Sequence, residues 1–295
     1  MSELWQEIER TISEATQSRF ANSSQATVSG GCINQAYQVR DKNAVYFVKL
    51  NNANKLDMFE AEFEALNEIQ QSNTVTVPRA VCTGVAQQSA FIVLEHLQLT
   101  VISKKGMSDL GQQLAAMHRT EQTQFGWTRD NTIGSTVQCN TLTANWHEFW
   151  QAQRLGFQLE LAGHNGYRGA LQKKGDKLME KMSGLFSSST IKASLLHGDL
   201  WSGNMAMLQS GSPVIFDPAL YYGDRETDIA MTELFGGFSE DFYQSYNEHY
   251  PLDQNYTIRK TFYNSYHILN HLNLFGGGYG QQAESMIDQV LSELG

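Results

Sequence analysis

One ordered stretch in the last third of the chain most constrains the fold. It runs from His197-Gly198-Asp199 through Asn204 to Phe216-Asp217-Pro218-Ala219. Between Asn204 and Asp217 lie two short apolar runs, 205–208 and 213–216, which are separated by a Gln-Ser-Gly-Ser turn composition. Because a hairpin brings its two open ends together, we expect the side chains of Asn204 and Asp217 to converge on one point.

Asp199, Asn204 and Asp217 together have the chemistry of a magnesium-dependent phosphoryl-transfer site. Mg²⁺ takes hard oxygen ligands, and an Asn carbonyl with an Asp carboxylate supplies the protein's usual share of its shell. Asp199, five residues before Asn204, is then placed to orient an attacking hydroxyl group and accept its proton. The simpler alternative is a loop in which Asp199 only caps backbone groups, but the ordered combination favours catalysis.

The first third of the chain has the pattern of an antiparallel sheet. Runs of β-prone residues at 27–28, 36–39, 44–50, 75–78 and 90–95 predict about five strands. Phe59 to Ile69 has the apolar stripe of a helix, and an amphipathic segment at the start of the chain predicts a further short helix. Helical patterns dominate after residue 97. We therefore predict an α+β chain with two lobes, 1–97 and 98–295, of which the second is mainly helical.

Residues of the first lobe fit the same chemistry. Lys49 ends a predicted strand, and the next helix offers Glu62 as the carboxylate that would hold it, with Glu60 and Glu64 as alternatives. Gly30 and Gly31 lie in a strand-turn-strand segment, where backbone N–H groups can approach phosphates closely. Taken alone, such a lysine is usually solvated, and paired glycines usually mark an ordinary turn. The chain lacks Gly-Lys-Ser/Thr, which excludes a Walker-type P-loop.

Charge and leader patterns exclude several classes of partner. The formal net charge is −10, which repels nucleic acid and anionic membranes. The first ten residues lack the basic and apolar regions of a signal peptide, and no apolar run reaches the length of a membrane span. Three widely separated cysteines indicate neither a disulfide scaffold nor a zinc site. We predict a cytoplasmic protein without a nucleic-acid or membrane partner.

At these residues the sequence resembles the fructosamine kinase (ketosamine kinase) family, relatives of aminoglycoside and choline kinases in the protein-kinase-like superfamily. The resemblance runs from Gly30-Gly31-Cys32-Ile33 through Phe47-Val48-Lys49 and the 197–204 segment to Tyr222-Gly223-Asp224-Arg225-Glu226, and so covers nearly the whole chain. It implies the two-lobed kinase fold with ATP and Mg²⁺ as cofactors. It also implies phosphorylation of the 3-hydroxyl of a free or protein-bound ketosamine, which then releases the amine and repairs glycated molecules.

The resemblance also implies a role for each matching position. Asp199 matches the catalytic base, Asn204 and Asp217 the magnesium ligands, Lys49 the phosphate-binding lysine and Glu62 its helix partner. Glu95, His96 and Leu97 match the hinge whose backbone binds adenine, and Asp228 matches a residue that braces the catalytic loop. Trp201 either walls the sugar pocket or packs in the interior.

The same residues leave rival functions open. A kinase for an aminoglycoside, choline or a similar alcohol would use the same catalytic groups, and the acidic segment 221–228 would suit a polycation. Asp224 and Glu226 in this segment are therefore candidate substrate-binding residues. A non-catalytic nucleotide-binding module would lack the base or a metal ligand, yet all these groups are present. A protein kinase would need Ala-Pro-Glu after Asp217, which is missing.

Cys32, in the glycine-rich turn, suggests redox control. A thiol near the phosphates would be open to oxidation or to pairing with another subunit. The protein is then a monomer, or a redox-linked dimer through Cys32. The simpler alternative is a small residue tolerated at a turn.

Overall fold

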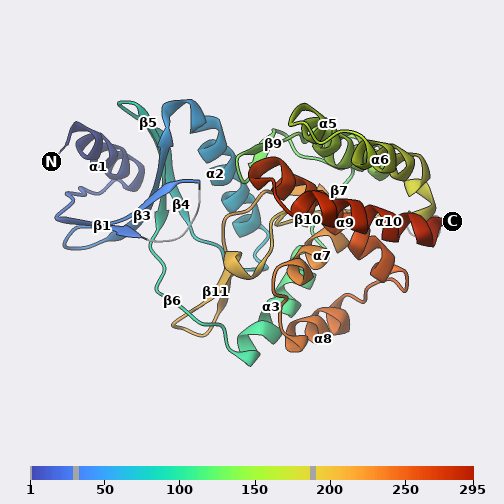
Figure 1. The fold of residues 1–295 in the computed structure, drawn as a ribbon. Coiled ribbons are helices and arrows are strands. Elements are labelled where there is room, and N and C mark those ends of the chain that lie inside the picture. The colour runs from blue at the N-terminus through green and yellow to red at the C-terminus, as the bar shows by residue number, and fades with distance from the viewer. Residues whose placement is uncertain (1, 29–32, 187–190) are drawn as a thin grey trace. The chain divides into compact units, whose positions relative to one another are not determined.

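The computed structural model describes residues 2–28, 33–186 and 191–295, and the chain divides into two compact units. The first comprises Met1–Ile102 and Ala206–Pro218, and the second comprises Ser103–Met205 and Ala219–Gly295. Figure 1 shows the elements of both units along the chain. The sequence patterns predicted a single boundary between the two lobes, between residues 97 and 98. In the structure the segment 206–218 also belongs to the first unit.

The first unit is built on a five-stranded sheet in the order β1-β2-β3-β5-β4, in which all neighbours are antiparallel. Its strands are β1 Ser24–Val28, β2 Gln35–Arg40, β3 Val45–Asn52, β4 Ala80–Ala86 and β5 Ser89–Glu95. Two helices, α1 Glu3–Thr16 and α2 Leu56–Gln71, belong to the same unit (Figure 1). The sheet has the predicted number and antiparallel pairing of strands, four of the five predicted strands are confirmed, and so are both predicted helices.

Alternation along β3 decides which of its side chains meet α1. Tyr46, Val48 and Leu50 belong to a buried apolar cluster that includes Trp5 and Ile8 of α1. Because successive side chains of a strand point to opposite faces, Lys49 lies on the other face of the sheet. The helix α1 thus fills one side of the sheet and leaves Lys49 to the other side.

One predicted strand is misplaced. The run 75–78 forms only a single parallel bridge, between Thr76 and Val214, and the fourth strand of the sheet is Ala80–Ala86 instead. Pro78 has no backbone N–H to donate to a neighbouring strand, which disfavours a regular ladder at this point. The apolar pattern of 75–78 has another cause, since Val75 and Val77 are buried.

A small three-stranded sheet explains why the 206–218 segment belongs to the first unit. It has the order β12-β11-β6, with β6 at Leu99–Thr100, β11 at Met205–Leu208 and β12 at Pro213–Ile215. The predicted hairpin is present, and its turn is closed by a bond from Leu208 N to Ser212 O of 2.8 Å. Ile215 N also donates to Thr76 O at 3.0 Å, so the hairpin is bonded to the first unit on both strands.

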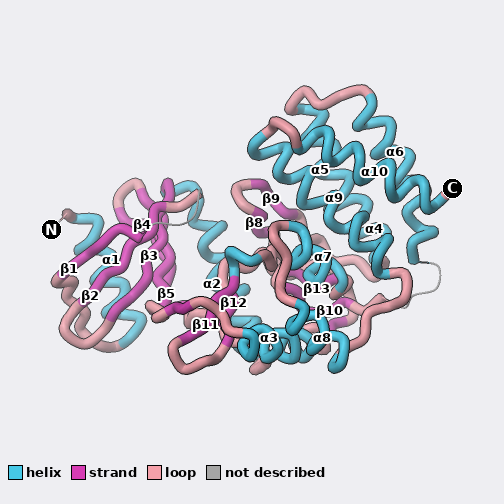
Figure 2. Tube along the Cα trace, turned by 60° about the horizontal axis from the view of Figure 1, so that its bottom comes forward, coloured by secondary structure: helices cyan, strands magenta, loops and turns pink. Residues whose placement is uncertain are grey.

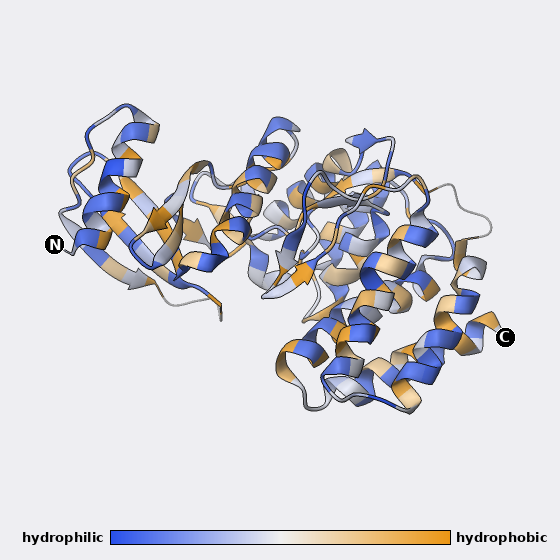
Figure 3. Cartoon of the chain, turned by 90° about the horizontal axis from the view of Figure 1, so that it is seen from above, coloured by the Kyte–Doolittle hydropathy of each residue, from blue (hydrophilic) through white to orange (hydrophobic). Residues whose placement is uncertain are grey.

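The second unit is mainly helical, as predicted. Its helices are α3 Lys104–Met117, α4 Trp146–Trp150, α5 Phe157–His164, α6 Ala170–Lys181, α7 Glu226–Leu234, α8 Glu240–His249, α9 Tyr256–Phe275 and α10 Tyr279–Leu294. Most of them alternate between hydrophilic and hydrophobic residues along their length, as helices with one buried face do (Figure 3). Among the described residues, none of the helices combines the length and the apolar character that crossing a membrane requires.

Short strands complete the second unit (Figure 2). They form the sheet β13-β10-β7 and the hairpin β8-β9, with β7 at Glu121–Gln122, β8 at Asn131–Ile133, β9 at Thr136–Gln138, β10 at Ala193–Leu196 and β13 at Tyr221–Gly223. The strand β10 is fully buried and leads directly into His197. This places the predicted catalytic segment at the end of a buried strand in the centre of this sheet.

Candidate active site

Lys49 stands between two carboxylates in the first unit. Its Nζ donates to Glu62 Oε1 at 2.7 Å and to Asp217 Oδ1 at 2.6 Å. The Lys49 and Glu62 side chains are only 8% and 11% exposed, whereas that of Asp217 is 48% exposed. Of the three glutamates considered on α2, Glu62 is the one that pairs with Lys49.

The charges of this group do not cancel. Burial alone would lower the pKa of Lys49, but the carboxylates of Asp217 and Glu62 outweigh it and raise the pKa above its usual value. Burial raises the pKa of Glu62, against the opposing effect of Lys49. Lys49 therefore stays protonated, and one ammonium group is shared by two acids. Such a group can accommodate a further cation beside Asp217, the more exposed of the two carboxylates.

An apolar pocket of about 410 Å³ adjoins this group within the first unit. Fourteen residues line it: Val28, Ile33, Asn34, Ala36, Phe47, Lys49, Pro78, Leu94, Glu95, His96, Leu97, Leu99, Phe216 and Asp217. The lining is mostly aliphatic and aromatic, with Lys49 and Asp217 among the few charged members. A flat apolar group with a charged tail, such as a nucleotide, matches a pocket of this kind.

The predicted hinge residues Glu95, His96 and Leu97 all line this pocket. Glu95 N donates to Arg79 O at 2.9 Å, and His96 N donates to Val45 O at 3.4 Å. Neither of these bonds uses the Glu95 carbonyl or the Leu97 N–H. The His96 ring is positioned by Gln38, whose side-chain amide nitrogen lies 2.7 Å from His96 Nε2.

In the second unit, residues 197–204 form what we call the Asp199 loop. Asn204 Nδ2 donates to the Asp199 backbone oxygen at 2.8 Å and to its carboxylate oxygen Oδ2 at 3.3 Å. A backbone carbonyl only accepts, so the amide nitrogen must face Asp199 and the Asn204 Oδ1 atom must face away. This orientation leaves a neutral hard oxygen free to bind a cation, which fits the predicted role of Asn204.

Asp228 braces the Asp199 loop from α7. Its carboxylate accepts from His197 N at 2.7 Å and from Gly198 N at 2.8 Å. The Nε2 atom of His118, on the other side, lies 3.1 Å from the same carboxylate. Burial alone would raise the pKa of Asp228, but the bonds from His118 and His197 lower it below its usual value. A buried, ionised Asp228 thus fixes the backbone that carries Asp199.

Sequence reasoning did not identify His118 as part of this arrangement. It is fully buried, and burial lowers its pKa, so the ring is neutral at physiological pH. Its Nδ1 atom accepts from the Tyr246 hydroxyl at 2.8 Å, and that hydroxyl in turn accepts from Arg225 at 2.9 Å. A histidine at the end of an amphipathic helix gives little signal in a single sequence, because its partner Asp228 lies 110 residues away.

Asp217 departs from ordinary backbone geometry. Its φ angle is 59°, in the left-handed region that residues with a side chain seldom adopt. Such outliers persist where the surroundings hold them and often lie at functional positions. Asp217 belongs to the first unit and Asn204 to the second. Neither unit, in its described part, contains a group of three His, Cys, Asp or Glu side chains arranged to hold a metal.

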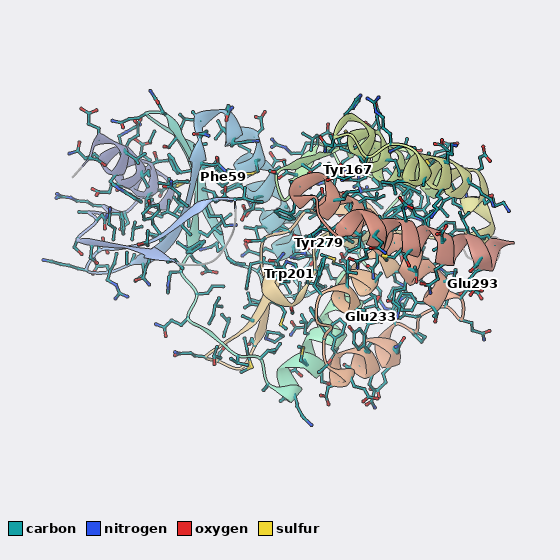
Figure 4. All side chains as sticks on the ribbon, in the orientation of Figure 1. Phe59, Tyr167, Trp201, Glu233, Tyr279 and Glu293 are labelled. Carbon is teal, nitrogen blue, oxygen red and sulfur yellow. The ribbon has the colours of Figure 1, made fainter. Side chains whose placement is uncertain are left out.

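Three further predicted substrate residues lie in the second unit. Trp201, which is labelled in Figure 4, is 38% exposed. Its indole lies so close to Gly203 that a Cβ added there would come within 2.3 Å of the ring. Asp224 and Glu226 are buried: Tyr263 donates to Asp224 at 2.6 Å, and Arg259 holds Glu226 at 2.7 and 2.8 Å. Trp201 is therefore not simply interior packing, while both acids have partners inside the protein. Their contact with a substrate stays a prediction.

Three of the predicted positions, Gly30, Gly31 and Cys32, lie outside the described residues. Of the other two cysteines, Cys82 is buried and Cys139 is partly exposed, and both are free thiols. Burial raises the pKa of Cys82 to about 12, which makes its thiol unreactive. The redox hypothesis for Cys32 stays a prediction.

The sheet unit with its Lys49–Glu62 pair and the helical unit with its Asp199 loop define a phosphotransferase of the two-lobed, protein-kinase-like fold. The family model for fructosamine kinase matches residues 4–293. The chain therefore belongs to the fructosamine kinase family.

Individual relatives agree with this assignment. A probable ketoamine kinase of Synechocystis is 46% identical over 288 residues, covering 97% of both chains. The chloroplastic protein-ribulosamine 3-kinase of Oryza sativa subsp. japonica is 41% identical over 272 residues, covering 91% of this chain and 79% of the relative. A solved structure from Haemophilus somnus that bears a fructosamine-3-kinase name aligns with a TM-score of 0.90 at 27% identity, covering 98% of each chain.

Proposed function

We propose that this chain transfers the γ-phosphoryl group of ATP to the 3-hydroxyl of a ketosamine, a fructosamine or ribulosamine, and so initiates removal of the sugar from the amine. The observation that carries the proposal is Lys49, held charged between Glu62 and Asp217 at the edge of an apolar pocket. Relatives named ketoamine kinase and ribulosamine 3-kinase support this class of acceptor. A free or protein-bound ketosamine fits the proposal equally.

Nucleotide binding is assigned to the first unit. The adenine ring would enter the apolar pocket and bond to the Glu95 carbonyl and the Leu97 N–H, two hinge groups that the bonds to Arg79 and Val45 do not use. Lys49 would leave Asp217 and bind the phosphates, while Glu62 keeps it in place. Asp217 would then be released to bind a cation.

The remaining roles fall on the Asp199 loop. Asp199 would orient the acceptor hydroxyl and take its proton as the phosphoryl group moves, a step in which position matters more than basicity. Asn204 Oδ1 and the Asp217 carboxylate would hold Mg²⁺, which when bound neutralises charge on the phosphates. Asp228 and His118 keep the loop backbone in place through the contacts described above.

Product analysis tests the proposal directly. Purified protein is incubated with Mg-ATP and a panel of ribulosamines, fructosamines, aminoglycosides and choline, and phosphorylated products are detected by mass spectrometry. We expect transfer to a ketosamine and a loss of about 10²- to 10⁴-fold in the Asp199→Asn variant, with ATP binding unchanged. Transfer only to another alcohol would show that the proposed substrate class is wrong. ATP binding without any phosphoryl transfer would indicate a non-catalytic nucleotide-binding module.

A further inference from the structure

A chain of buried amide side chains joins the β8–β9 hairpin to the backbone just after Asp217. Gln138 Nε2 donates to Ala219 O at 3.0 Å, and Asn131 Nδ2 donates to Leu220 O at 2.7 Å. Gln138 and Asn131 face each other across the hairpin and are themselves bonded at 2.9 Å. Only 1% of Gln138 and 7% of Asn131 are exposed, so these bonds are shielded from water.

The donors and acceptors in this chain allow only one orientation of each amide. The carbonyls of Ala219 and Leu220 only accept, so the nitrogens of Gln138 and Asn131 must face them. Gln138 Oε1 is then left to accept from the Tyr266 hydroxyl at 2.7 Å. Every polar atom of the Gln138 side chain is therefore used, and the amide cannot turn without breaking a bond.

A buried cation anchors the other end of the network. Arg154 is fully buried and donates to Asn140 Oδ1 at 2.7 Å. Asn140 Nδ2 in turn donates to Asn131 Oδ1 at 3.0 Å. Bonds from a charged donor are stronger than neutral ones and polarise the bonds that follow, so Arg154 stiffens the whole series.

Ala219, whose carbonyl accepts from Gln138, also contacts the Asp199 loop. Ala219 N donates to His197 O at 2.8 Å. Its carbonyl lies so close to Gly198 that an added Cβ there would come within 2.0 Å of the oxygen, and Gly198 has a φ of 82°. The direction of the Ala219 carbonyl therefore decides where Gly198, and with it Asp199, can lie.

We propose that Gln138 and Asn131 are positioning residues for Asp199, acting through the backbone of Ala219 and Leu220. Asp228 holds the Asp199 loop through the N–H groups of His197 and Gly198. The residues of the β8–β9 hairpin hold it through the Ala219 carbonyl, which packs on Gly198. The proposal rests on the proposed function, in which Asp199 assists phosphoryl transfer. It adds two residues that touch neither nucleotide nor acceptor.

The test compares Gln138→Leu with the matched control Gln172→Leu. Gln172 is also a glutamine of the second unit whose Nε2 donates to two backbone carbonyls, those of Leu159 and Tyr167, both at 2.9 Å, rather than to Ala219. In Gln138→Leu we expect kcat to fall by about 10- to 100-fold with the KM for ATP unchanged, because a small displacement of Asp199 slows chemistry without altering the nucleotide pocket. Gln172→Leu should retain the wild-type kcat. Asn131→Ser, a smaller change, should also lower kcat. It provides the test if Gln138→Leu does not fold.

Hydrogen exchange gives a readout that does not depend on activity. The amides of residues 197–199 should exchange faster in Gln138→Leu and Asn131→Ser than in the wild type, and not in Gln172→Leu. Equal losses of kcat in both glutamine variants, or unchanged kcat and exchange in the hairpin variants, would overturn the proposal. A wild-type protein that phosphorylates nothing would defeat the proposed function instead, while the exchange comparison would still decide whether the hairpin holds the loop.

Discussion

Replacing Lys49 by methionine should destabilise the protein chiefly through Glu62. The side chains of Lys49 and Glu62 are about nine-tenths buried, and their atoms lie 2.7 Å apart. Methionine fills the space but leaves a buried carboxylate without its cation. Breaking such a pair typically costs about 3–5 kcal/mol, and in a chain of this size that lowers Tm by roughly 6–10 °C. Asp217 is half exposed and remains hydrated, so it contributes little to the loss.

The assay is a set of thermal unfolding curves on single and double variants without nucleotide. Adding Glu62→Gln to Lys49→Met removes the orphaned charge and should recover most of the lost Tm, although activity stays absent. Lys192→Met is the matched control, since Lys192 forms an exposed pair with Glu121, and its Tm should match the wild type.

The pH dependence supplies a second check on the same reasoning. Burial already raises the pKa of Glu62, and loss of Lys49 would raise it further. The folded state then binds a proton more readily than the unfolded state, so the deficit of Lys49→Met is present at high pH and shrinks as pH falls through the folded pKa. A double variant no more stable than Lys49→Met, or a deficit independent of pH, would refute the argument.

Three further outcomes follow from the site. Asn204→Ala should raise the Mg²⁺ concentration needed for half-maximal rate by at least about tenfold, as measured by metal titration of the transfer rate. Trp201→Ala should raise the KM for the acceptor by about three- to tenfold and leave the KM for ATP unchanged in steady-state kinetics, because its exposed ring would lose only packing with the acceptor. Burial raises the pKa of Glu226 to about 7, so its stabilising contribution is present in acid and lost as pH rises through about 7. Glu226→Gln should flatten the Tm-versus-pH curve in that range.

Features carried by local pattern could be predicted from the sequence. The first helix, four of the five strands and the hairpin at 205–215 each depend on residues close together in the chain. The pairing of Lys49 with Glu62 could also be predicted, because the two residues are only 13 positions apart and the choice lay among three glutamates of the next helix. The fourth strand was not, because its residues Ala80–Ala86 alternate weakly and the stronger apolar run at 75–78 packs without forming a ladder.

The supports of the Asp199 loop could not be predicted in the same way. His118 and Asp228 are 110 residues apart, and Gln138 and Ala219 are 81 apart. In a single sequence each of these polar residues resembles a solvated one, since neither periodicity nor spacing marks a buried amide whose acceptor is a distant carbonyl. Their identity depends on the three-dimensional path of the chain, which local patterns do not determine.

The hairpin at 205–215 shows how the two kinds of information combine. Its turn composition predicts two paired strands, but nothing local reveals that β11 pairs with β6 or that Ile215 bonds to Thr76. Those contacts attach the hairpin to the first unit and bring Asp217 to Lys49 across 168 residues of sequence. The hairpin crosses between the two units at both of its ends, at 205–206 and 218–219. Asp217 is therefore attached to the same unit as the apolar pocket, whereas the Asp199 loop is held by Asp228 of α7 and, in our proposal, by the β8–β9 hairpin. Variants of the apolar pocket should therefore alter chiefly the affinity for nucleotide, and variants of Gln138 or Asn131 chiefly kcat.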